Sequence, residues 1–173
     1  PANPEKSGRA ELGAGSGQKI LLIDVGTGSG CIPIATMKTL KQENAAAEQY
    51  KKITVCATDI SQDALIIAKK NAKKHDVDIT FLHGDLLEPI FYNNVTIQQC
   101  NNLILTANLP YLTAEQFAAE PTIQHEPKSA LIAADNGLAL YKKLLDQIKE
   151  FVSCYVLRVT CFMEIDPSQS QPL

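Results

Sequence analysis

The sequence predicts an α/β fold with a mostly parallel, doubly wound sheet, and three observations lead to it. Short apolar runs typical of buried strands alternate with longer segments of helical periodicity, which is the pattern of consecutive βαβ units. A glycine-rich loop joins the first of these strands to the first helix. The chain has 173 residues, of which 45% are hydrophobic and 20% charged, as expected for one globular domain with a sizeable core.

The first half of the chain contains three predicted strands and two predicted helices. Residues 1–18 are rich in Gly, Pro, Ala, Ser and charge, which predicts a linker or disordered arm before a domain over residues 19–173. The helices are expected from about Cys31 to Leu40 and, after an N-cap at Ser61, to about Lys74. Each predicted strand is a short apolar run that ends near a glycine loop or an aspartate: Ile20–Val25, Ile53–Thr58 and Ile79–Leu82.

The second half of the chain is less regular. Residues 88–100 predict a loop or a short helix, because a proline and an Asn-Asn pair interrupt them. A fourth strand follows, then a helix-rich stretch with two prolines, and finally a helix and a fifth strand. The expected bounds of these three elements are Leu103–Ala107, about Leu138 to Glu150, and Tyr155–Ile165.

Composition and charge exclude several classes of protein. A net charge of −3 and a pI near 5.6 give no general attraction to nucleic acid, so no strong nucleic-acid binding is expected. The five cysteines form no CxxC pair and no metal-ligand spacing with histidine, which indicates reduced thiols in the cytoplasm and no metal site. No stretch approaches the ~20 apolar residues of a membrane span, and no signal peptide is evident.

The loop after the first strand is a candidate ligand-binding loop. Its alternate glycines let a ligand approach the backbone, and the helix that follows offers free N–H groups. The loop has neither the Gly-Lys-Ser/Thr of a P-loop nor the Gly-x-Gly-x-x-Gly spacing of a dinucleotide-binding fingerprint. A tight turn without a ligand is the alternative. The candidate binding residues are Asp24, Gly26, Thr27, Gly28, Ser29 and Gly30.

The next two strands end near aspartates. Asp59 ends the second strand, where a carboxylate can accept hydrogen bonds from both ribose hydroxyls of a nucleoside. The alternative role of Asp59 is to cap the helix that begins near Ser61. Asp85 and Leu86 follow the third strand. Asp85 has acceptors for an adenine amino group and Leu86 can pack on the ring, while an ordinary turn is the alternative.

The tetrapeptide Asn108-Leu109-Pro110-Tyr111 follows the fourth strand, at the edge where open α/β sheets bind ligands. The Asn108 side-chain oxygen and the Leu109 carbonyl are two acceptors in a turn that Pro110 stiffens, and Tyr111 offers an aromatic face. Two such acceptors can bind both N–H groups of a planar amide or amino nitrogen. These four residues are the candidate catalytic residues.

The motifs together resemble a known family. The glycine spacing resembles motif I of class I S-adenosylmethionine-dependent methyltransferases, and the tetrapeptide resembles the Asn-Pro-Pro-Tyr motif of enzymes that methylate amide or nucleobase nitrogens. As a set, they look like the peptide-chain-release-factor glutamine methyltransferases, the PrmC/HemK family. The matching segments are Asp-Val-Gly-Thr-Gly-Ser-Gly-Cys-Ile (24–32), Ala-Thr-Asp-Ile-Ser-Gln-Asp-Ala-Leu (57–65), Gly-Asp-Leu-Leu-Glu-Pro (84–89), Asp135-Asn136-Gly137-Leu138 and Met163-Glu164-Ile165.

The resemblance implies a Rossmann-like class I methyltransferase fold with S-adenosylmethionine as the cofactor. It implies that Gly26–Gly30, Asp59, Leu86 and Asn108 contact that cofactor, and that the turn contacts a glutamine side chain. The implied substrate is the glutamine in the Gly-Gly-Gln motif of a peptide chain release factor, and the implied process is translation termination.

The chain departs from the family pattern in ways that leave other functions open. Leu109 replaces the first proline of the motif, which keeps a carbonyl but predicts a less rigid turn. Only a short polar arm stands where members carry an N-terminal helical domain, and the C-terminal strands are expected to be truncated. The alternatives are a nucleic-acid adenine or cytosine amino-methyltransferase and a cofactor-binding but inactive domain. The glycine spacing disfavours a dehydrogenase.

Overall fold

A computed structural model describes residues 19–43, 52–93, 100–154 and 158–170 of the chain. The arm predicted over residues 1–18 lies outside the described residues, as do the first residues of the predicted fifth strand.

The sheet is parallel and five-stranded, with the strand order β3-β2-β1-β4-β5. This confirms the predicted parallel α/β fold. The order reverses between β1 and β4, and ligands bind at such a switch point in open α/β sheets. The strands are β1 (Ile20–Val25), β2 (Ile53–Asp59), β3 (Thr80–His83), β4 (Asn102–Ala107) and β5 (Arg158–Met163).

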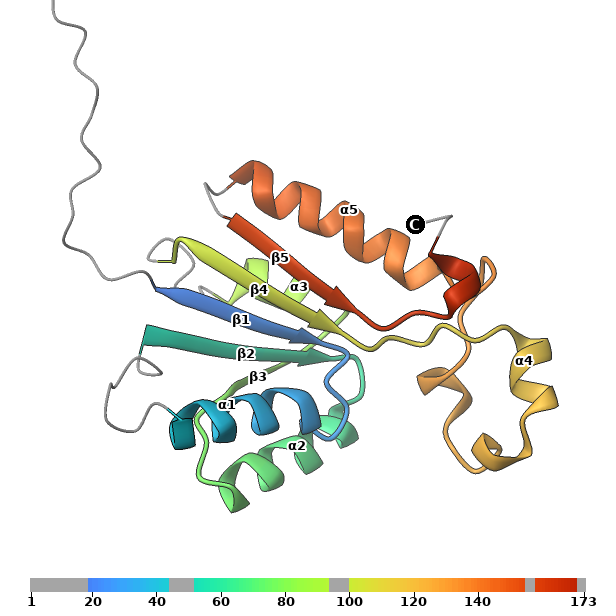
Figure 1. The fold of residues 1–173 in the computed structure, drawn as a ribbon, viewed down its shortest axis with the longest axis horizontal. Coiled ribbons are helices and arrows are strands. Elements are labelled where there is room, and N and C mark those ends of the chain that lie inside the picture. The colour runs from blue at the N-terminus through green and yellow to red at the C-terminus, as the bar shows by residue number, and fades with distance from the viewer. Residues whose placement is uncertain (1–18, 44–51, 94–99, 155–157, 171–173) are drawn as a thin grey trace, which may run out of the picture.

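Helices cover both faces of the sheet. Helices α1 and α2 lie on one side and α5 on the other, while α4 lies beyond the carboxyl ends of the strands (Figure 1). The α1 helix continues past its predicted end at Leu40, and α5 continues past Glu150. The helices are α1 (Cys31–Glu43), α2 (Gln62–Lys74), α3 (Glu88–Tyr92), α4 (Ala114–Ala119) and α5 (Ala139–Cys154), with 3-10 turns at Pro121–Ile123, Lys128–Ala130 and Pro167–Gln169.

The core has one cluster on each face of the sheet. Leu21 and Ile23 of β1 pack in the cluster that contains Tyr141 and Phe151 of α5. Leu22, the residue between them, packs in the second cluster with Ile34 of α1. Because successive strand residues point to opposite faces and both faces are covered, β1 is apolar at every position except Asp24.

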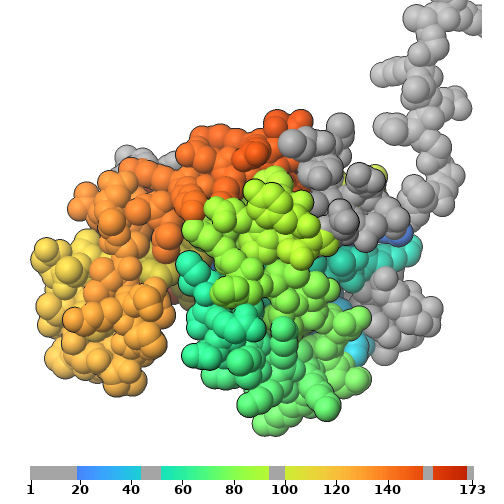
Figure 2. Space-filling model, turned by 180° about the vertical axis from the view of Figure 1, so that it is seen from behind, coloured from blue at the N-terminus to red at the C-terminus, as the bar shows by residue number. Residues whose placement is uncertain are grey.

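The chain between Leu112 and Ile132 extends beyond the sheet and then returns to the residues that follow the tetrapeptide. Leu112 forms an isolated parallel bridge with Ile132. Gly137 has a φ of +83°, and a Cβ placed on it would lie 1.9 Å from the Tyr111 carbonyl oxygen. Only glycine permits that approach. Figure 2 shows that the molecular surface is hollowed between this segment, around residues 120–135, and the side of the molecule formed by α2.

Candidate functional site

The glycine loop connects β1 to α1 through a backbone that only glycines adopt readily. Gly26, Gly28 and Gly30 have φ values of +70°, +57° and +82°. The Thr27 N–H donates to the Thr58 carbonyl at 2.9 Å, which ties the loop to the end of β2. A Cβ placed on Gly28 would meet no atom within 4 Å. The loop is therefore bound to β2 at Thr27, while the space beside the Gly28 Cα is open, so that a ligand can approach the backbone there.

Asp59 holds the loop from the neighbouring strand. Its Oδ2 accepts from the Gly28 N–H at 2.7 Å, and its Oδ1 accepts from the Ser61 N–H at 2.8 Å. Ser61 is the N-cap of α2 and accepts from the Ala64 N–H at 3.2 Å. The cap is thus supplied by Ser61. A carboxylate has about four acceptor positions, so Asp59 keeps room for the two hydroxyls of a ribose.

Asp24 lies beneath the loop, with 1% of its surface exposed. Its Oδ1 accepts from the Thr106 hydroxyl of β4 at 2.6 Å, while its Oδ2 makes no hydrogen bond of standard geometry in the described part of the chain. Burial raises the pKa of Asp24, the hydroxyls of Thr106 and Thr27 oppose that rise, and the charge on Asp59 adds to it. Asp24 can therefore act on a bound cation through its field, but its oxygens do not line the surface of the site.

Asp85 and Leu86 lie just beyond β3. Asp85 Oδ2 pairs with Lys143 of α5 at 2.5 Å, and Lys143 also lies 3.4 Å from Glu88. Leu86 has a φ of +50° and is 7% exposed, packed in the α5-side core. The proposed contacts of these two residues with an adenine ring stay predictions. The ion pair is a contact of Asp85 that sequence reasoning did not anticipate.

The tetrapeptide turn lies directly beside the glycine loop. Val25, which ends β1, is paired with Ala107, which ends β4. A Cβ placed on Gly26 would lie 2.7 Å from Leu109 Cδ2 and 3.9 Å from the Asn108 carbonyl oxygen. The structure therefore brings the loop and the turn together at the switch point of the sheet, as their positions after strands predicted.

Leu109 is anchored through the N–H group that a proline would lack. This N–H donates to the Tyr141 hydroxyl of α5 at 3.1 Å, and the Tyr141 hydroxyl in turn donates to the Glu164 carbonyl. Tyr141 is fully buried, and burial raises its pKa to about 12. The replacement of a proline by Leu109 predicted a less rigid turn. This hydrogen bond restrains the turn in place of the proline ring.

The ends of the turn are held from the segment that follows β5. Asn108 Nδ2 donates to Glu164 Oε2 at 3.1 Å, and the Tyr111 hydroxyl donates to Glu164 Oε1 at 3.0 Å. Gln169 Nε2 donates to the carbonyls of Tyr111 and Asn136, both at 2.8 Å. Burial and the Glu164 hydrogen bond raise the pKa of Tyr111, which keeps its phenol protonated as a donor.

Three residues around the turn were missed as site residues from the sequence: Tyr141, Glu164 and Gln169. Glu164 carried a usable signal, because it directly follows a strand and so lies at the binding edge. Tyr141 lies within the α5 helix, and the sequence pattern of that helix did not single it out. Gln169 lies in a 3-10 turn and is 4% exposed, and no local pattern pointed to its long-range partners.

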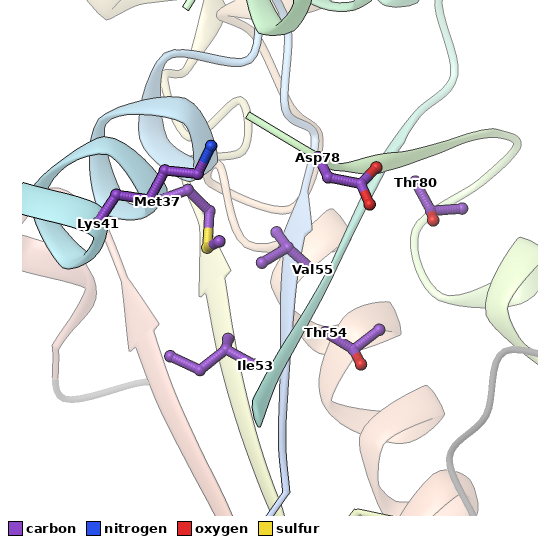
Figure 3. A pocket seen from close by; sticks show the side chains of 7 residues that line it. All are labelled: Met37, Lys41, Ile53, Thr54, Val55, Asp78 and Thr80. Atoms are coloured by element: carbon purple, nitrogen blue, oxygen red, sulfur yellow. The ribbon is translucent and has the colours of Figure 1, made fainter. Parts of the chain in front are cut away.

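A second hollow of about 300 Å³ lies away from this edge. It is lined by residues of α1 and by the beginnings of β2 and β3, as Figure 3 shows. Ile53 and Thr80 are the first residues of their strands, so the hollow lies at the amino end of the sheet. None of the candidate site residues predicted from the sequence lines this hollow, and we place the site at the carboxyl edge.

Within the described ranges, no helix is long and apolar enough to cross a membrane. In the same part of the chain, no group of three or more His, Cys, Asp or Glu residues is placed to hold a metal ion.

Comparisons with known proteins show which proteins the chain is similar to. No family model matches the chain. A release factor glutamine methyltransferase of Bacillus anthracis is 34% identical over 133 residues, which cover 76% of this chain and 42% of the relative. One of Deinococcus radiodurans is 31% identical over 157 residues, covering 90% of this chain and 49% of the relative. The chain thus spans less than half the length of these two relatives.

Solved structures support the fold. The human Mettl16 catalytic domain, solved with the MAT2A 3′UTR hairpin 1, matches with a TM-score of 0.56 at 17% identity and covers 88% of this chain and 52% of its own. The human methyltransferase 10 domain containing protein matches with a TM-score of 0.52 at 15% identity, covering 94% of this chain and 62% of its own.

Fold and site together define a domain of the class I methyltransferases, whose methyl donor is S-adenosylmethionine. Within that class, the chain is a relative of the release factor glutamine methyltransferases, the PrmC/HemK family.

Proposed function

We propose that this domain transfers a methyl group from S-adenosylmethionine to the side-chain amide nitrogen of a glutamine, the one in the Gly-Gly-Gln motif of a peptide chain release factor. The single observation that carries the proposal is the contact between the glycine loop and the tetrapeptide turn, since Gly26 adjoins Leu109 at the switch point. A cofactor on the loop and an amide on the turn would then be neighbours. The names of the relatives support the choice of substrate.

The residues present fit the cofactor. The open backbone at Gly28 permits close approach of a ligand, and the spare acceptors of Asp59 suit two ribose hydroxyls. The buried Oδ2 of Asp24, which has no hydrogen-bond partner in the described part of the chain, supplies negative potential beneath the loop. That potential suits a ligand that carries an ammonium and a sulfonium group, and would repel one that carries a pyrophosphate.

The turn fits an amide substrate. An amide nitrogen is a poor nucleophile, because its lone pair is delocalised into the carbonyl. The Asn108 side-chain oxygen and the Leu109 carbonyl would accept its two N–H bonds and hold the nitrogen with its lone pair directed at the methyl group. The Tyr111 ring would stack on the planar amide. This is catalysis by positioning and electrostatics.

The reaction balances without a covalent enzyme intermediate. The bound S-adenosylmethionine supplies a methyl group activated by its sulfonium. With that group bound, the amide nitrogen held by Asn108 and Leu109 would form the N–C bond as the S–C bond breaks, S-adenosylhomocysteine would be the leaving group, and the nitrogen would then lose one proton to water. The acceptors at Asn108 and Leu109 stabilise the positive charge that develops on the nitrogen before that proton leaves.

The decisive experiment incubates the protein with methyl-labelled S-adenosylmethionine and a release factor, with a release factor carrying Gln→Ala in its Gly-Gly-Gln motif as the matched control. We expect label on the first protein and none on the second. Equal labelling of both would refute the assigned glutamine. Cofactor binding without label on any release factor would indicate an inactive domain, and label on DNA or RNA instead would indicate a nucleic-acid methyltransferase.

A further inference from the structure

Glu164 is the first residue after β5, so its side chain starts from the same edge of the sheet as Asn108. Its carboxylate contacts both ends of the tetrapeptide turn. Oε2 accepts from Asn108 Nδ2 at 3.1 Å, and Oε1 accepts from the Tyr111 hydroxyl at 3.0 Å. A single side chain from the neighbouring strand thus bridges the two side chains that the proposed function places against the substrate.

The backbone of Glu164 is itself fixed on both sides. Its N–H donates to the carbonyl of Ala107, the residue before Asn108, at 3.1 Å. Its carbonyl accepts from the Tyr141 hydroxyl, which also accepts the Leu109 N–H. The carboxylate is therefore presented from a backbone that is tied to the turn it contacts, although the side chain is exposed.

The chemistry of the pair sets the orientation of the Asn108 amide. A side-chain amide has one donor end and one acceptor end, and an ionised carboxylate only accepts. The Glu164 oxygen therefore takes the Nδ2 end, because the reversed amide would place two oxygen acceptors against each other at about the same distance. Oδ1 is then left to point away from Glu164.

We infer that Glu164 is a positioning residue that selects the orientation of the Asn108 amide, so that Oδ1 and not Nδ2 is available to the amino group of the substrate. This inference rests on the proposed function. With the amide reversed, Asn108 would present two donors to a substrate nitrogen that also donates, and the hydrogen bond would be lost. Glu164 contributes to catalysis by fixing Asn108, and does not contact the substrate itself.

The second contact of Glu164 supports this role. The Tyr111 hydroxyl donates to the carboxylate, and this bond adds to burial in raising the Tyr111 pKa. Each oxygen of the Glu164 carboxylate therefore accepts one charge-assisted hydrogen bond. The bond to Tyr111 fixes the carboxylate, and the carboxylate in turn fixes the Asn108 amide. The turn and its aromatic ring are thus oriented by one group.

The test compares Glu164→Gln and Glu164→Ala with Glu150→Gln, an exposed glutamate on α5. A glutamine at position 164 can pair with Asn108 in either orientation, so the preference is lost. We expect kcat for methylation of the release factor to fall about tenfold in Glu164→Gln and further in Glu164→Ala. The affinity for S-adenosylhomocysteine, measured by calorimetry, should stay at the wild-type value, and Glu164→Gln, which keeps a side chain of the same size, should stay folded.

A second measurement needs no activity. The Nδ2 protons of Asn108 can be followed by ¹H–¹⁵N NMR and assigned with Asn108→Ala. Loss of the carboxylate should shift this signal and speed its exchange with water, while Glu150→Gln leaves it unchanged. Wild-type kcat in both Glu164 variants, or an unchanged Asn108 signal in Glu164→Ala, would overturn the inference.

The two proposals can fail separately. A wild-type protein that methylates no release factor refutes the proposed function, and the NMR measurement then still decides whether Glu164 orients Asn108. If the protein methylates the release factor and kcat is the same in wild type and both Glu164 variants, the proposed function stands and the positioning role of Glu164 is refuted.

Discussion

The glycine loop after β1 and the tetrapeptide turn after β4 lie side by side, but different kinds of contact hold them. The loop is tied to the adjacent end of β2, through the Thr27 N–H to the Thr58 carbonyl and the Gly28 N–H to Asp59. The turn is tied by side chains that come from much later in the chain, above all Tyr141 and Glu164.

This difference separates the two tasks of the site. The hydrogen bonds of the loop to Thr58 and Asp59 lie within the single unit β1–α1–β2. The turn is in place only when α5 and the end of β5 have packed against β4. We therefore expect changes in the loop half to affect cofactor affinity, and changes in the turn half to affect methyl transfer or the stability of the fold.

The largest expected effect is on the turn. Asn108→Ala removes the side-chain acceptor that we propose for the substrate, and we expect kcat to fall about a hundredfold or more, with cofactor affinity within a few fold of wild type. Radiolabel transfer and calorimetry measure the two quantities, with the exposed Asn101→Ala as the control. Full activity in Asn108→Ala would refute the mechanism.

The next effect is on the loop half. Asp59→Ala removes the bond to the Gly28 N–H and the acceptors that we propose for the ribose. We expect cofactor affinity to fall roughly 10- to 100-fold, the effect of losing hydrogen bonds to a charged group. Calorimetry with S-adenosylhomocysteine tests this, and Asp146→Ala, which breaks only a surface ion pair with Lys149, is the control. Unchanged affinity would remove Asp59 from the cofactor site.

Tyr141→Phe tests the anchor of the turn. The change leaves the Leu109 N–H buried without a partner, which costs about 1–3 kcal/mol of unfolding free energy. Chemical denaturation measures this loss. Tyr92→Phe changes a tyrosine that is 83% exposed and should stay within about 0.5 kcal/mol of wild type. Equal stability of the two variants would show that the N–H bond does not hold the turn.

The smallest expected effect is a gain in stability, whereas the changes above reduce activity, affinity or stability. Burial raises the pKa of Asp24 above its ordinary 3.8, so the ionised carboxylate destabilises the fold at neutral pH. Asp24→Asn keeps the acceptor for Thr106 and removes the buried charge, so its unfolding free energy relative to wild type should be higher at about pH 7 than at about pH 4. The gain should shrink as the pH falls through the raised pKa toward 3.8, where wild-type Asp24 is also neutral.

A pH series of thermal melts, with and without S-adenosylhomocysteine, measures this gain. The same variant should bind the cofactor less tightly, because the field beneath the loop is lost, but should lose less affinity than Asp59→Ala. A stability gain that persists unchanged at low pH would contradict the electrostatic cause.

Much of the site could be predicted because its groups follow directly after apolar strands. The glycine loop, Asp59 and Asn108 each stand at the end of a strand, and parallel strands bring such ends to one edge. Their placement together needed only the strand assignment. The adenine contacts expected of Asp85 and Leu86 stay predictions, since the structure adds an ion pair with Lys143 and a buried leucine side chain to that region.

The sequence by itself determined the parallel α/β fold, the loop and the turn, because these depend on local periodicity and on which residues end each strand. Only the tertiary structure decided how the turn is held. Tyr141, Glu164 and Gln169 reach it from 32, 56 and 58 residues away. Nothing in a local pattern encodes such a partner, since it is chosen by the packing of α5 and β5 against β4. For the same reason, only the fold showed that the N–H of Leu109 is used where a proline has none to offer.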